Sequence, residues 1–480
     1  MEIGQMIDFI LNDRNIRADA PLDSRVLDFL RKSRRLVGVK EGCREGACGA
    51  CLVLVGELDG KTISYRSMNS CLLPLAEIEG KHVVTIEGLD DGAVKVLNPI
   101  QQAILDDGAT QCGYCTPGII LALTGLFLEN PYFDQEQATD AVSGNICRCT
   151  GYQSIKRAAI RLCDMFSPSD SGDEKASMAR LVEKRILPPY FLQIPERLRE
   201  MPVPDEPPLK IRPDSIVVGG GTALWGRENV EPPHTDLIHL SRREELKGIR
   251  LDGDRCYVGA ATTFEEVQDS PIMQRFFPRI GDYFKLIASK PIRHRITVGG
   301  NIADAVPYAD AAVFFLAMGA SVVLTDRRDR REVALKDFFK GYRQPDKEDG
   351  EFVEAIRFPT PTEDTRFNFE NISKRPHLDI SSVNSAAQIT MKNGVMARVH
   401  LSAGGVAPVP LYLSGASRYL TGKTPKPDTV REAAAIAQSE SSPISDVRGS
   451  AKYKRLLLRQ LIYAHFITLF PERITLEGLR

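Results

Sequence analysis

The first 88 residues place short apolar runs between polar, glycine-containing turns, which is the pattern of β-strands. The strand-like runs are Met6–Leu11, Cys51–Val55, Thr62–Ser67 and Lys81–Ile86. A turn at Leu58–Lys61 joins two of them and predicts a hairpin. Pro21–Leu30 predicts a helix, with Asp23 or Ser24 near its N-cap. We expect residues 1–88 to form a small domain of mixed strands with one helix.

Residues 89–166 carry helix signals instead of strand signals. The expected helical segments are Ile100–Leu105, Ile119–Leu128, Asp134–Val142 and Tyr152–Phe166. Asn98 and Pro99 give the first segment a capping residue and a first-turn proline, and Thr116 and Pro117 do the same for the second. Because the connections are short, these segments predict a small helical bundle.

Residues 167–189 are expected to be a linker, since Ser167–Asp173 is small and polar with almost nothing to bury. Residues 190–365 have an α/β pattern that includes a strand at Ser215–Val218. Residues 366–480 predict a further α+β domain. Other expected strands and helices in this half are Leu335–Tyr342, Glu351–Phe358, Ala386–Met391, Ala397–Ala403, Thr429–Ser439 and Lys452–Leu469.

The composition is that of an ordinary globular protein. The chain has 480 residues, of which 43% are hydrophobic and 26% charged, and about three domains are expected. Its net charge of −1 gives no electrostatic reason to bind nucleic acid or an anionic membrane. The N-terminal segment does not resemble a secretory signal, and the longest apolar run, Gly118–Leu128, is too short to span a bilayer. We expect a soluble, cytoplasmic protein whose ten cysteines form no disulfide framework.

Three cysteines lie in one glycine-containing loop, and a fourth follows the predicted hairpin: Cys43, Cys48, Cys51 and Cys71. A C-x4-C-x2-C motif with a distant fourth cysteine is the ligand pattern of a plant-type [2Fe–2S] site. Glycines suit such a loop, because positive φ angles and close backbone approach let N–H groups point at the sulfurs. A zinc site is the alternative, although zinc usually takes two C-x2-C-like motifs.

A second group of four cysteines combines a C-x2-C with a C-x-C motif: Cys112, Cys115, Cys147 and Cys149. Both motifs lie at or next to predicted helix N-termini, where free N–H groups and the helix dipole stabilise thiolates. We interpret them as one four-cysteine cluster site, with structural zinc as the alternative. The two remaining cysteines, Cys163 and Cys256, are expected to be small buried apolar residues.

Two glycine loops stand out beyond residue 190. The strand Ser215–Val218 runs into Gly219–Thr222, and the N–H groups of such a loop can line a phosphate-binding concavity. A tight turn between strands is the alternative. A second loop, Thr297–Asn301, strengthens the phosphate interpretation, and Asp310 behind it is a candidate partner for a ribose or an adenine. His294 is expected to be a surface residue beside two arginines.

The order of these motifs resembles the small iron–sulfur and FAD subunit of bacterial xanthine dehydrogenase, within the molybdenum hydroxylase family. The resemblance covers essentially the whole chain and rests on KEGCREGACGAC, QCGYCTPG, GNICRCTGY, VVGGGTALW, TVGGNIADAVPYAD and SPISDVRGSAKY. It implies a multidomain α+β fold. The implied domains are a β-grasp, plant-type ferredoxin domain (1–88), a four-helix [2Fe–2S] bundle (89–166), an α/β FAD-binding domain of the PCMH type (190–365) and a C-terminal α+β flavoprotein domain (366–480).

The resemblance also implies cofactor sites. The first cysteine group would hold the cluster nearer the flavin, and the second would hold the cluster nearer a molybdenum cofactor. Gln111 matches a glutamine that lies against the pterin of that cofactor. Positions that match the FAD site are Val217, Val218, Gly219, Gly220, Gly221, Thr222, Ala223, Leu224, Ile287, Thr297, Asn301, Asp304, Asp310 and Val353, with Tyr342 and Arg343 close to it. Ala223 stands where the family usually has Asp or Glu, and Asn371 where many members have Lys, so both bear on flavin affinity.

The implied function is electron transfer in a xanthine dehydrogenase, an oxidoreductase. Electrons would arrive from a molybdenum site on a partner large subunit, pass through the two [2Fe–2S] clusters to FAD and reach NAD+. A heterotetramer with two copies of each subunit is the expected assembly. No residue of this chain is expected to be catalytic in the hydroxylation itself.

Other functions remain open at this point. The same electron relay could serve an aldehyde hydroxylase or a hydroxylase of another N-heterocycle, because the large subunit would select the substrate. The chain could also be a stand-alone electron-transfer reductase, or a zinc-stabilised scaffold without redox chemistry. Oxygen could replace NAD+ as the final acceptor.

Overall fold

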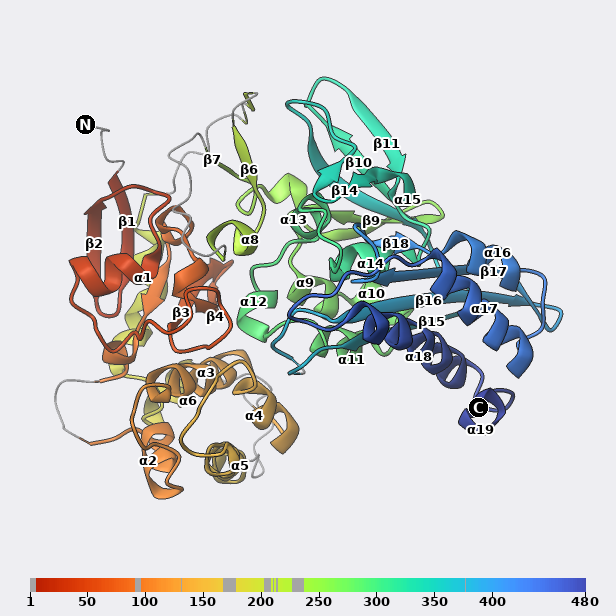
Figure 1. Cartoon of the computed structure of the whole chain (residues 1–480). Coiled ribbons are helices and arrows are strands. Elements are labelled where there is room, and N and C mark those ends of the chain that lie inside the picture. The colour runs from red at the N-terminus through yellow and green to blue at the C-terminus, as the bar shows by residue number, and fades with distance from the viewer. Residues whose placement is uncertain are drawn as a thin grey trace. The chain divides into compact units, whose positions relative to one another are not determined.

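The computed structural model describes residues 6–90, 96–130, 132–166, 178–202, 209, 211–212, 215–226, 237–375 and 377–480. The chain divides into two compact units. The first unit comprises Met1–Pro208, Gly221–Thr235 and Ser289–Arg295, and the second comprises Leu209–Gly220, Asp236–Ala288 and Ile296–Arg480. Figure 1 labels the helices and strands of both units.

A mixed sheet forms the N-terminal part of the first unit. Its strands, in spatial order, are β2 (Arg14–Asp19), β1 (Met6–Leu11), β5 (His82–Val84), β3 (Leu52–Asp59) and β4 (Thr62–Asn69). Strands β1 and β5 are parallel, and the other neighbours are antiparallel. This is the expected β-grasp arrangement, and the predicted β3–β4 hairpin is confirmed. Strand β2 was not predicted, because most of its side chains are exposed and give no apolar run.

The helix predicted at Pro21–Leu30 begins later and is shorter. Helix α1 (Val26–Asp28) continues into a π-helical turn at Phe29–Ser33. Its N-cap is Arg25, which makes no side-chain capping bond, so Asp23 and Ser24 lie near the N-cap as expected, but neither is the N-cap itself. The reason is tertiary: backbone hydrogen bonds tie the segment before the helix to residues 73–76 in an extended conformation.

The predicted helical bundle is confirmed as α2 (Pro99–Asp106), α3 (Thr116–Glu129), α4 (Gln135–Ala141) and α5 (Gln153–Phe166). Asn98 caps α2, because its side chain accepts from the N–H of Gln101 at 2.8 Å, and Asp134 caps α4 in the same way. Thr116 is the first helical residue of α3 and not its cap, which is Cys115. The bundle shares one apolar core with residues of β3 and β4.

Residues 178–199 belong to the first unit. They form α6 (Met178–Glu183), a 3₁₀-helix (Pro189–Gln193) and α7 (Ile194–Arg199). Phe191 is buried in the bundle core, and Ile194 packs in a cluster with Ile10 of β1. The described part of the expected linker is therefore packed, and the expected start of the FAD domain at residue 190 lies inside the first unit. The polar segment Ser167–Asp173 lies outside the described residues.

The second unit begins with a strand pair and contains an antiparallel sheet. Strand β6 (Ile216–Val218) pairs in parallel with β7 (Leu237–His239). The sheet has the order β11 (Arg330–Ala334), β10 (Ser321–Thr325), β14 (Phe352–Pro359), β9 (Arg255–Gly259) and β8 (Ile249–Asp252). A phenylalanine-rich core lies between this sheet and the helices α9 (Phe264–Asp269), α10 (Pro271–Phe276), α11 (Ile280–Lys285), α13 (Val298–Ala303) and α14 (Asp310–Leu316). The segment expected at Leu335–Tyr342 is split into α15 (Leu335–Phe338) and β12 (Phe339–Gly341), which pairs with β13 (Gln344–Pro345).

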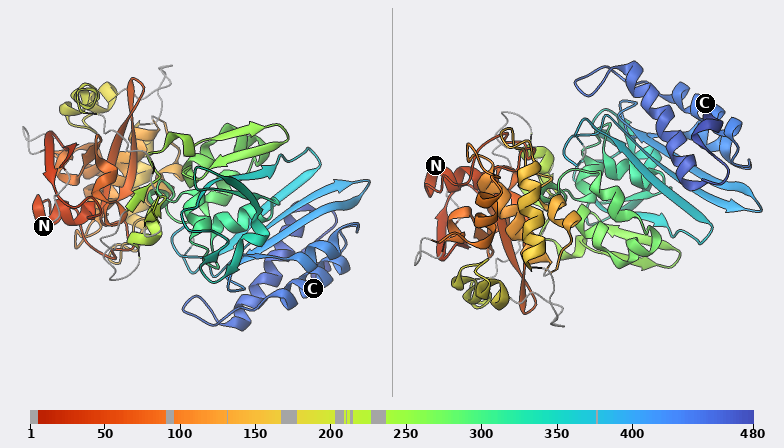
Figure 2. Two further views of the ribbon diagram at one scale, coloured as in Figure 1. Left: turned by 90° about the horizontal axis from the view of Figure 1, so that it is seen from above. Right: turned by 90° about the horizontal axis from the view of Figure 1, so that it is seen from below.

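A second antiparallel sheet closes the chain. Its order is β15 (Thr365–Ile372), β16 (Val383–Lys392), β17 (Val395–Gly404) and β18 (Leu411–Tyr412). Helices α16 (Ser414–Leu420), α17 (Pro427–Glu440) and α18 (Ala451–Leu469) lie together beside this sheet (Figure 2), followed by α19 (Leu476–Leu479). The strands and helices predicted here are confirmed, and β15, β18, α16 and α19 are additions.

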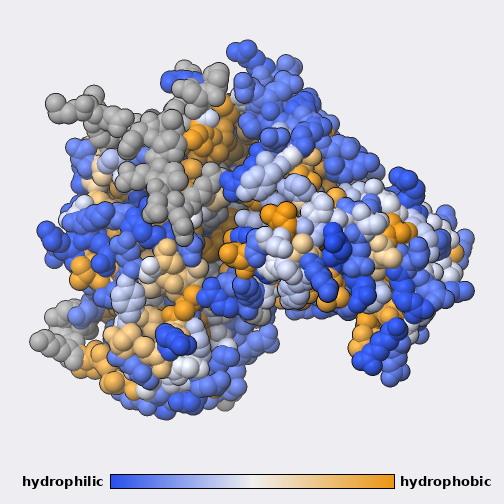
Figure 3. Space-filling view, in the orientation of Figure 1, coloured by the Kyte–Doolittle hydropathy of each residue, from blue (hydrophilic) through white to orange (hydrophobic). Residues whose placement is uncertain are grey.

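The surface is mostly hydrophilic (Figure 3), as expected for a chain with 26% charged residues. Figure 3 shows hydrophilic residues over most of the visible face of the second unit, with hydrophobic residues scattered among them. Among the described residues, no helix combines the length and apolar character that a membrane crossing needs.

Candidate functional site

The fold gathers the first cysteine group into two pairs. Cys43, Cys48 and Cys51 lie in the loop before β3, and the hairpin returns Cys71 beside them in a 3₁₀-turn (Ser70–Leu72). The Cys43 and Cys48 thiols are hydrogen-bonded to each other, and so are those of Cys51 and Cys71. Cys43 is also close enough to both members of the second pair to interact electrostatically with them. The spacing in sequence thus becomes one four-thiol site.

Backbone N–H groups of the loop point at these sulfurs, as the glycine content predicted. The thiol of Cys43 accepts from Cys48 and from the N–H groups of Glu45, Ala47 and Cys48, which together lower its pKa to about 5. The N–H of Gly46 donates to Cys71. Gly46 has a φ of 80°, which a residue with a side chain adopts only under strain.

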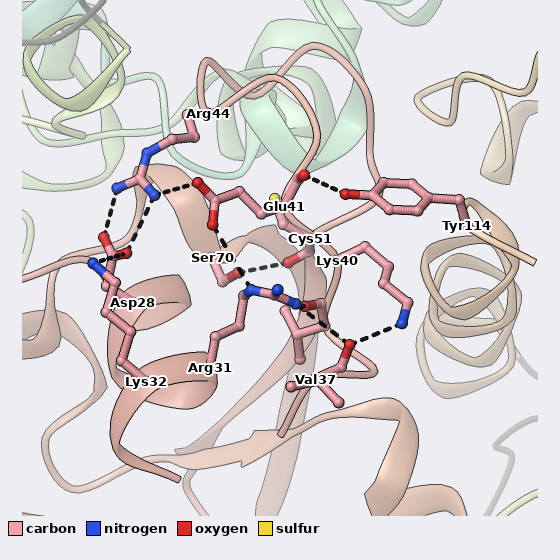
Figure 4. Close-up of polar contacts among 11 residues, drawn as sticks. Asp28, Arg31, Lys32, Val37, Lys40, Glu41, Arg44, Cys51, Ser70 and Tyr114 are labelled. Atoms are coloured by element: carbon pink, nitrogen blue, oxygen red, sulfur yellow. Dashed lines mark hydrogen bonds and ion pairs between the residues drawn. The ribbon is translucent and has the colours of Figure 1, made fainter. Parts of the chain in front are cut away.

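Charged and aromatic side chains anchor the loop from outside (Figure 4). Arg44 donates to Asp28 of α1 at 2.6 Å and to Glu41 at 2.6 Å. These bonds and the nearby charge of Lys32 lower the pKa of Asp28, although burial alone would raise it. Tyr114, from the second cysteine group, donates to the carbonyl of Glu41. No local pattern assigned a role to Arg44 or Tyr114, and only their position inside the cysteine motifs could have pointed to them.

The second cysteine group also forms two pairs at the end of the bundle. Cys112 contacts Cys149, and Cys115 contacts Cys147. Cys115 is the N-cap of α3, as expected for a thiolate at a helix N-terminus. The hydroxyl of Thr150 lies 3.1 Å from the Cys147 sulfur. Burial raises the pKa of that thiol, but hydrogen bonds from Thr150, Cys115 and the N–H of Cys149 together lower it below its usual value. Cys112 and Cys149 are exposed, as is Gln111, so one edge of this site faces the surface.

The two cysteine loops touch each other through two hydrogen bonds, one between backbone groups and one from a side chain. The N–H of Ile146 donates to the carbonyl of Cys48 at 2.9 Å. The buried side chain of Asn145 donates to the carbonyl of Gly49 at 3.1 Å. One hydrogen bond therefore joins Cys48 of the first group to the residue that precedes Cys147 of the second. Asn145 was missed as a functional residue, because its partner is 96 positions away in sequence.

The paired arrangement fits binuclear clusters better than zinc. A structural zinc ion holds four sulfurs about 2.3 Å from a single centre. Two thiol pairs that are close to each other, with N–H donors around them, are instead the donor set of a [2Fe–2S] cluster.

The two glycine loops also meet, within the second unit. A Cβ on Gly219 would collide with the hydroxyl of Thr297 and lie 3.3 Å from the Cα of Gly300. Thr297 caps α13, since its hydroxyl accepts from the N–H of Gly300 at 3.1 Å. Gly221 takes a left-handed φ of 75°. Because only glycine allows this approach, the loops fit the backbone cradle expected for a phosphate. From Gly221 on, the segment with Thr222, Ala223 and Leu224 is part of the first unit.

The polar residues that were assigned to the ribose and phosphates have protein partners. Asn301 accepts from the N–H of Ala311 at 3.0 Å, and Asp304 pairs with Arg343 at 3.5 Å. Asp310, at the start of α14, is surrounded by neutral donors: Ser381 at 3.1 Å, Asn384 at 2.5 Å and Asn371 at 3.5 Å. Burial raises the pKa of Asp310 to about 6 despite these bonds. Asn371 therefore faces a carboxylate at the position where a lysine would supply a positive charge.

The remaining predicted residues lie in the core or at the surface. Ile287 and Val353 are buried in the phenylalanine-rich core of the second unit. Tyr342 is exposed, and Cys163 and Cys256 are buried as expected. His294 is buried and not at the surface, so that expectation is wrong. It is enclosed in the first unit, where its Nδ1 lies 3.1 Å from the carbonyl of Ser67.

Four family models match the chain in sequence. They are a 2Fe–2S iron–sulfur cluster binding domain (residues 9–76), a [2Fe–2S] binding domain (85–160), an FAD binding domain in molybdopterin dehydrogenase (208–361) and a CO dehydrogenase flavoprotein C-terminal domain (369–469). Their order is the order inferred from the motifs.

Known proteins with the same domains are similar along most of this chain. Xanthine dehydrogenase of Emericella nidulans is 28% identical over 88% of this chain, and aldehyde oxidase 1 of Rattus norvegicus is 23% identical over 100% of it. The chain spans only 35% and 40% of the length of these two relatives. A solved chain of carbon monoxide dehydrogenase from Hydrogenophaga pseudoflava matches 55% of this chain and 91% of its own length, with 29% identity and a TM-score of 0.51. The four domains and their order match the iron–sulfur and flavin-binding part of molybdenum hydroxylases.

Proposed function

We propose that this chain is the electron-transfer subunit of a xanthine dehydrogenase. It would take electrons from a molybdenum site on a partner subunit and deliver them to FAD and then to NAD+. [2Fe–2S] clusters carry single electrons and FAD exchanges one or two, so these groups supply a link between a two-electron donor and NAD+. The residues of this chain would hold the cofactors in the order in which electrons pass between them.

The hydrogen bond between the two cysteine loops carries this proposal. The carbonyl of Cys48 accepts from the N–H of Ile146, and Ile146 is bonded to Cys147. The backbone thus provides a short bonded path between ligands of the two sites. A scaffold that used each metal only for stability would not need this contact.

The exposure of the second cysteine group supports a partner on that side. Cys112 and Cys149 are exposed, whereas Cys51 and Cys71 are buried. Gln111 lies next to Cys112 and is also exposed. Electrons would therefore enter at the second site, where a partner subunit can come close, and leave through the enclosed first site toward the flavin.

The substrate class rests on the relatives. Xanthine dehydrogenases are prominent among them, which favours a purine. Aldehyde oxidases match over a similar length, so an aldehyde is the second candidate. The partner subunit would decide between them.

Two measurements test the proposal. The purified chain should contain about four iron atoms and one FAD, and anaerobic NADH should bleach its visible spectrum without any partner. Zinc in a colourless protein would exclude the redox function, and iron that NADH fails to reduce would exclude NAD+ as the acceptor. Copurification from the native cell should then recover a molybdenum protein, and the complex should reduce NAD+ with xanthine. A complex that oxidises aldehydes and leaves xanthine untouched would assign the second candidate instead.

A further inference from the structure

A short segment from the flavin-binding half of the sequence is built into the first unit. Ser289–Arg295 belongs to the first unit, although the residues on both sides of it belong to the second. Its central residues form α12 (Lys290–Arg293), which packs against β4. Ala288, just before the segment, has a left-handed φ of 49°, an uncommon conformation for a residue with a Cβ. The chain thus turns sharply where the segment begins.

Polar contacts hold this segment firmly in place. Arg295 pairs with Glu77 at 3.0 Å, and the side chains of both residues are less than a tenth exposed. Lys290 pairs with Glu129 at the end of α3, and His294 binds the carbonyl of Ser67. A buried ion pair tolerates little displacement, because moving either partner leaves a charge without compensation.

The segment Ser289–Arg295 packs closely against both cysteine loops. A Cβ at Gly46 would lie 2.5 Å from Ile292 Cδ1 and 2.5 Å from Leu72 Cδ1. A Cβ at Gly144 would lie 2.9 Å from the Cβ of Ser289. Gly46 is the residue whose N–H donates to Cys71. The side chain of Ile292 therefore covers the peptide that supplies this N–H···S bond.

We propose that Ile292 is a positioning residue for the first cluster: together with Leu72 it covers Gly46 and keeps water away from the N–H that points at Cys71. The proposal rests on the assignment of a [2Fe–2S] cluster to the first cysteine group. Exclusion of water from around such a cluster lowers its potential, so this cover would keep the potential lower than an open loop would allow. The flavin-binding half of the chain would in this way tune the cluster that precedes it in the relay.

The test substitutes Ile292 in the full chain. Ile292→Ala should raise the midpoint potential of the first cluster, measured by redox titration followed by EPR, and leave the second cluster unchanged. Hydrogen–deuterium exchange of the 43–51 peptide should become about tenfold faster, because the half-buried side chain no longer seals the loop. Ile292→Leu, which keeps the number of side-chain carbons, should retain most of the midpoint potential of the unaltered first cluster. Ile380→Ala removes an exposed isoleucine of the second unit and is the matched control.

Each outcome separates the inference from the proposed function. Cys71→Ala and Cys147→Ala variants, each lacking one cluster, assign the two EPR signals. An unaltered chain without iron would refute the cluster assignment itself. A chain with about four iron atoms whose Ile292→Ala variant shows an unchanged or lower first potential would refute only the role of Ile292. An equal shift of both clusters would show general loosening and would also count against it.

Discussion

Gly49 is the residue at which the two cysteine loops are most tightly joined. Its φ is 67°, and a Cβ there would lie 2.6 Å from the carbonyl oxygen of Gly144 and 2.6 Å from the side chain of Asn145. A Cβ on Gly118 of α3 would collide with the carbonyl oxygen of Gly49 itself. Because fixed backbone surrounds it on two sides, neither a side chain nor a shift of the loop can be accommodated without parting the loops.

Gly49→Ala should reduce the iron content at both cysteine sites. The left-handed backbone costs about 1–2 kcal/mol with a Cβ, and the overlap with Gly144 adds about 1–3 kcal/mol. Iron analysis and the visible spectrum of the purified variant measure the loss.

Gly60→Ala is the matched control for Gly49→Ala. Gly60 has a similar φ of 59°, and a Cβ there meets nothing within 4 Å. This variant should lose only the backbone term and keep its full iron content. Equal iron loss in the two variants would show that the contact between the loops is unimportant.

The buried pair of Arg295 and Glu77 is the second residue-scale feature with a measurable effect. Glu77→Gln leaves a buried arginine without its carboxylate, and the first unit should lose about 3–5 kcal/mol of its free energy of unfolding. Glu57→Gln breaks the Lys81–Glu57 pair, whose carboxylate is largely exposed, and should cost about 0–1 kcal/mol. Urea unfolding of both variants gives the comparison, and equal costs would contradict the importance of burial.

At the scale of single elements, the starts of two helices could be read from the sequence. Asn98 and Asp134 were expected to start helices, and both make reciprocal capping boxes. Their partners, Gln101 and Gln137, lie three residues away, so the whole interaction is local and legible in the sequence. The start of α1 and strand β2 could not be predicted, because distant segments fix the first and the second has little apolar content.

Asn98→Ala should destabilise α2 and the bundle around it. The variant loses the bond to the N–H of Gln101, and the first unit should lose about 1 kcal/mol of its free energy of unfolding. Gln102→Ala removes a side chain from the exposed face of the same helix and should change this quantity by less than about 0.5 kcal/mol. Urea unfolding followed by circular dichroism measures both, and a neutral Asn98→Ala would mean that the proline at the first turn suffices.

At the scale of the whole molecule, each unit buries a neutral histidine. His82 of the first unit accepts from the hydroxyl of Tyr65 at 2.7 Å and donates to the carbonyl of Asn12 at 2.9 Å. His465 of the second unit bridges Asn368 and Ser385 at 2.9 Å and 3.0 Å. Burial lowers the pKa of both imidazoles to about 3.

Both units should therefore lose stability as the pH falls. The unfolded chain takes up a proton on each histidine near pH 6.5, whereas the folded chain does so only near pH 3. The contribution of each neutral histidine to the free energy of unfolding is fully present above about pH 6.5. Below that pH, each histidine lowers the free energy of unfolding by up to about 1.4 kcal/mol per pH unit. His465→Gln cannot titrate and should flatten this slope for the second unit, as calorimetry at pH 4.5–7 would show. A slope equal to that of the unaltered chain would assign the acid sensitivity to other groups.

The cysteine sites were far more predictable than the organisation of the whole chain. The spacing of Cys43 to Cys51 and of Cys112 to Cys149 predicts two groups of thiols, because one cluster would need all of its thiols together. The pairing of the thiols, the contact between the loops and the place of Ile292 arise only when distant segments pack. The segments Gly221–Thr235 and Ser289–Arg295 also belong to the first unit although residues of the second unit precede and follow them, which no local pattern reports.

The segment Gly221–Thr235, which belongs to the first unit, carries Trp225, the chain's single tryptophan. Trp225 is fully buried in the first unit, where its indole N–H donates to the carbonyl of Asp23 at 3.0 Å. The guanidinium of Arg25 donates to the backbone carbonyl of Trp225. Indole fluorescence therefore reports on the first unit alone. An iron–sulfur chromophore within the same unit would absorb the emission, so a rise in fluorescence would mark loss of the clusters, and a later red shift would mark unfolding of the protein around Trp225.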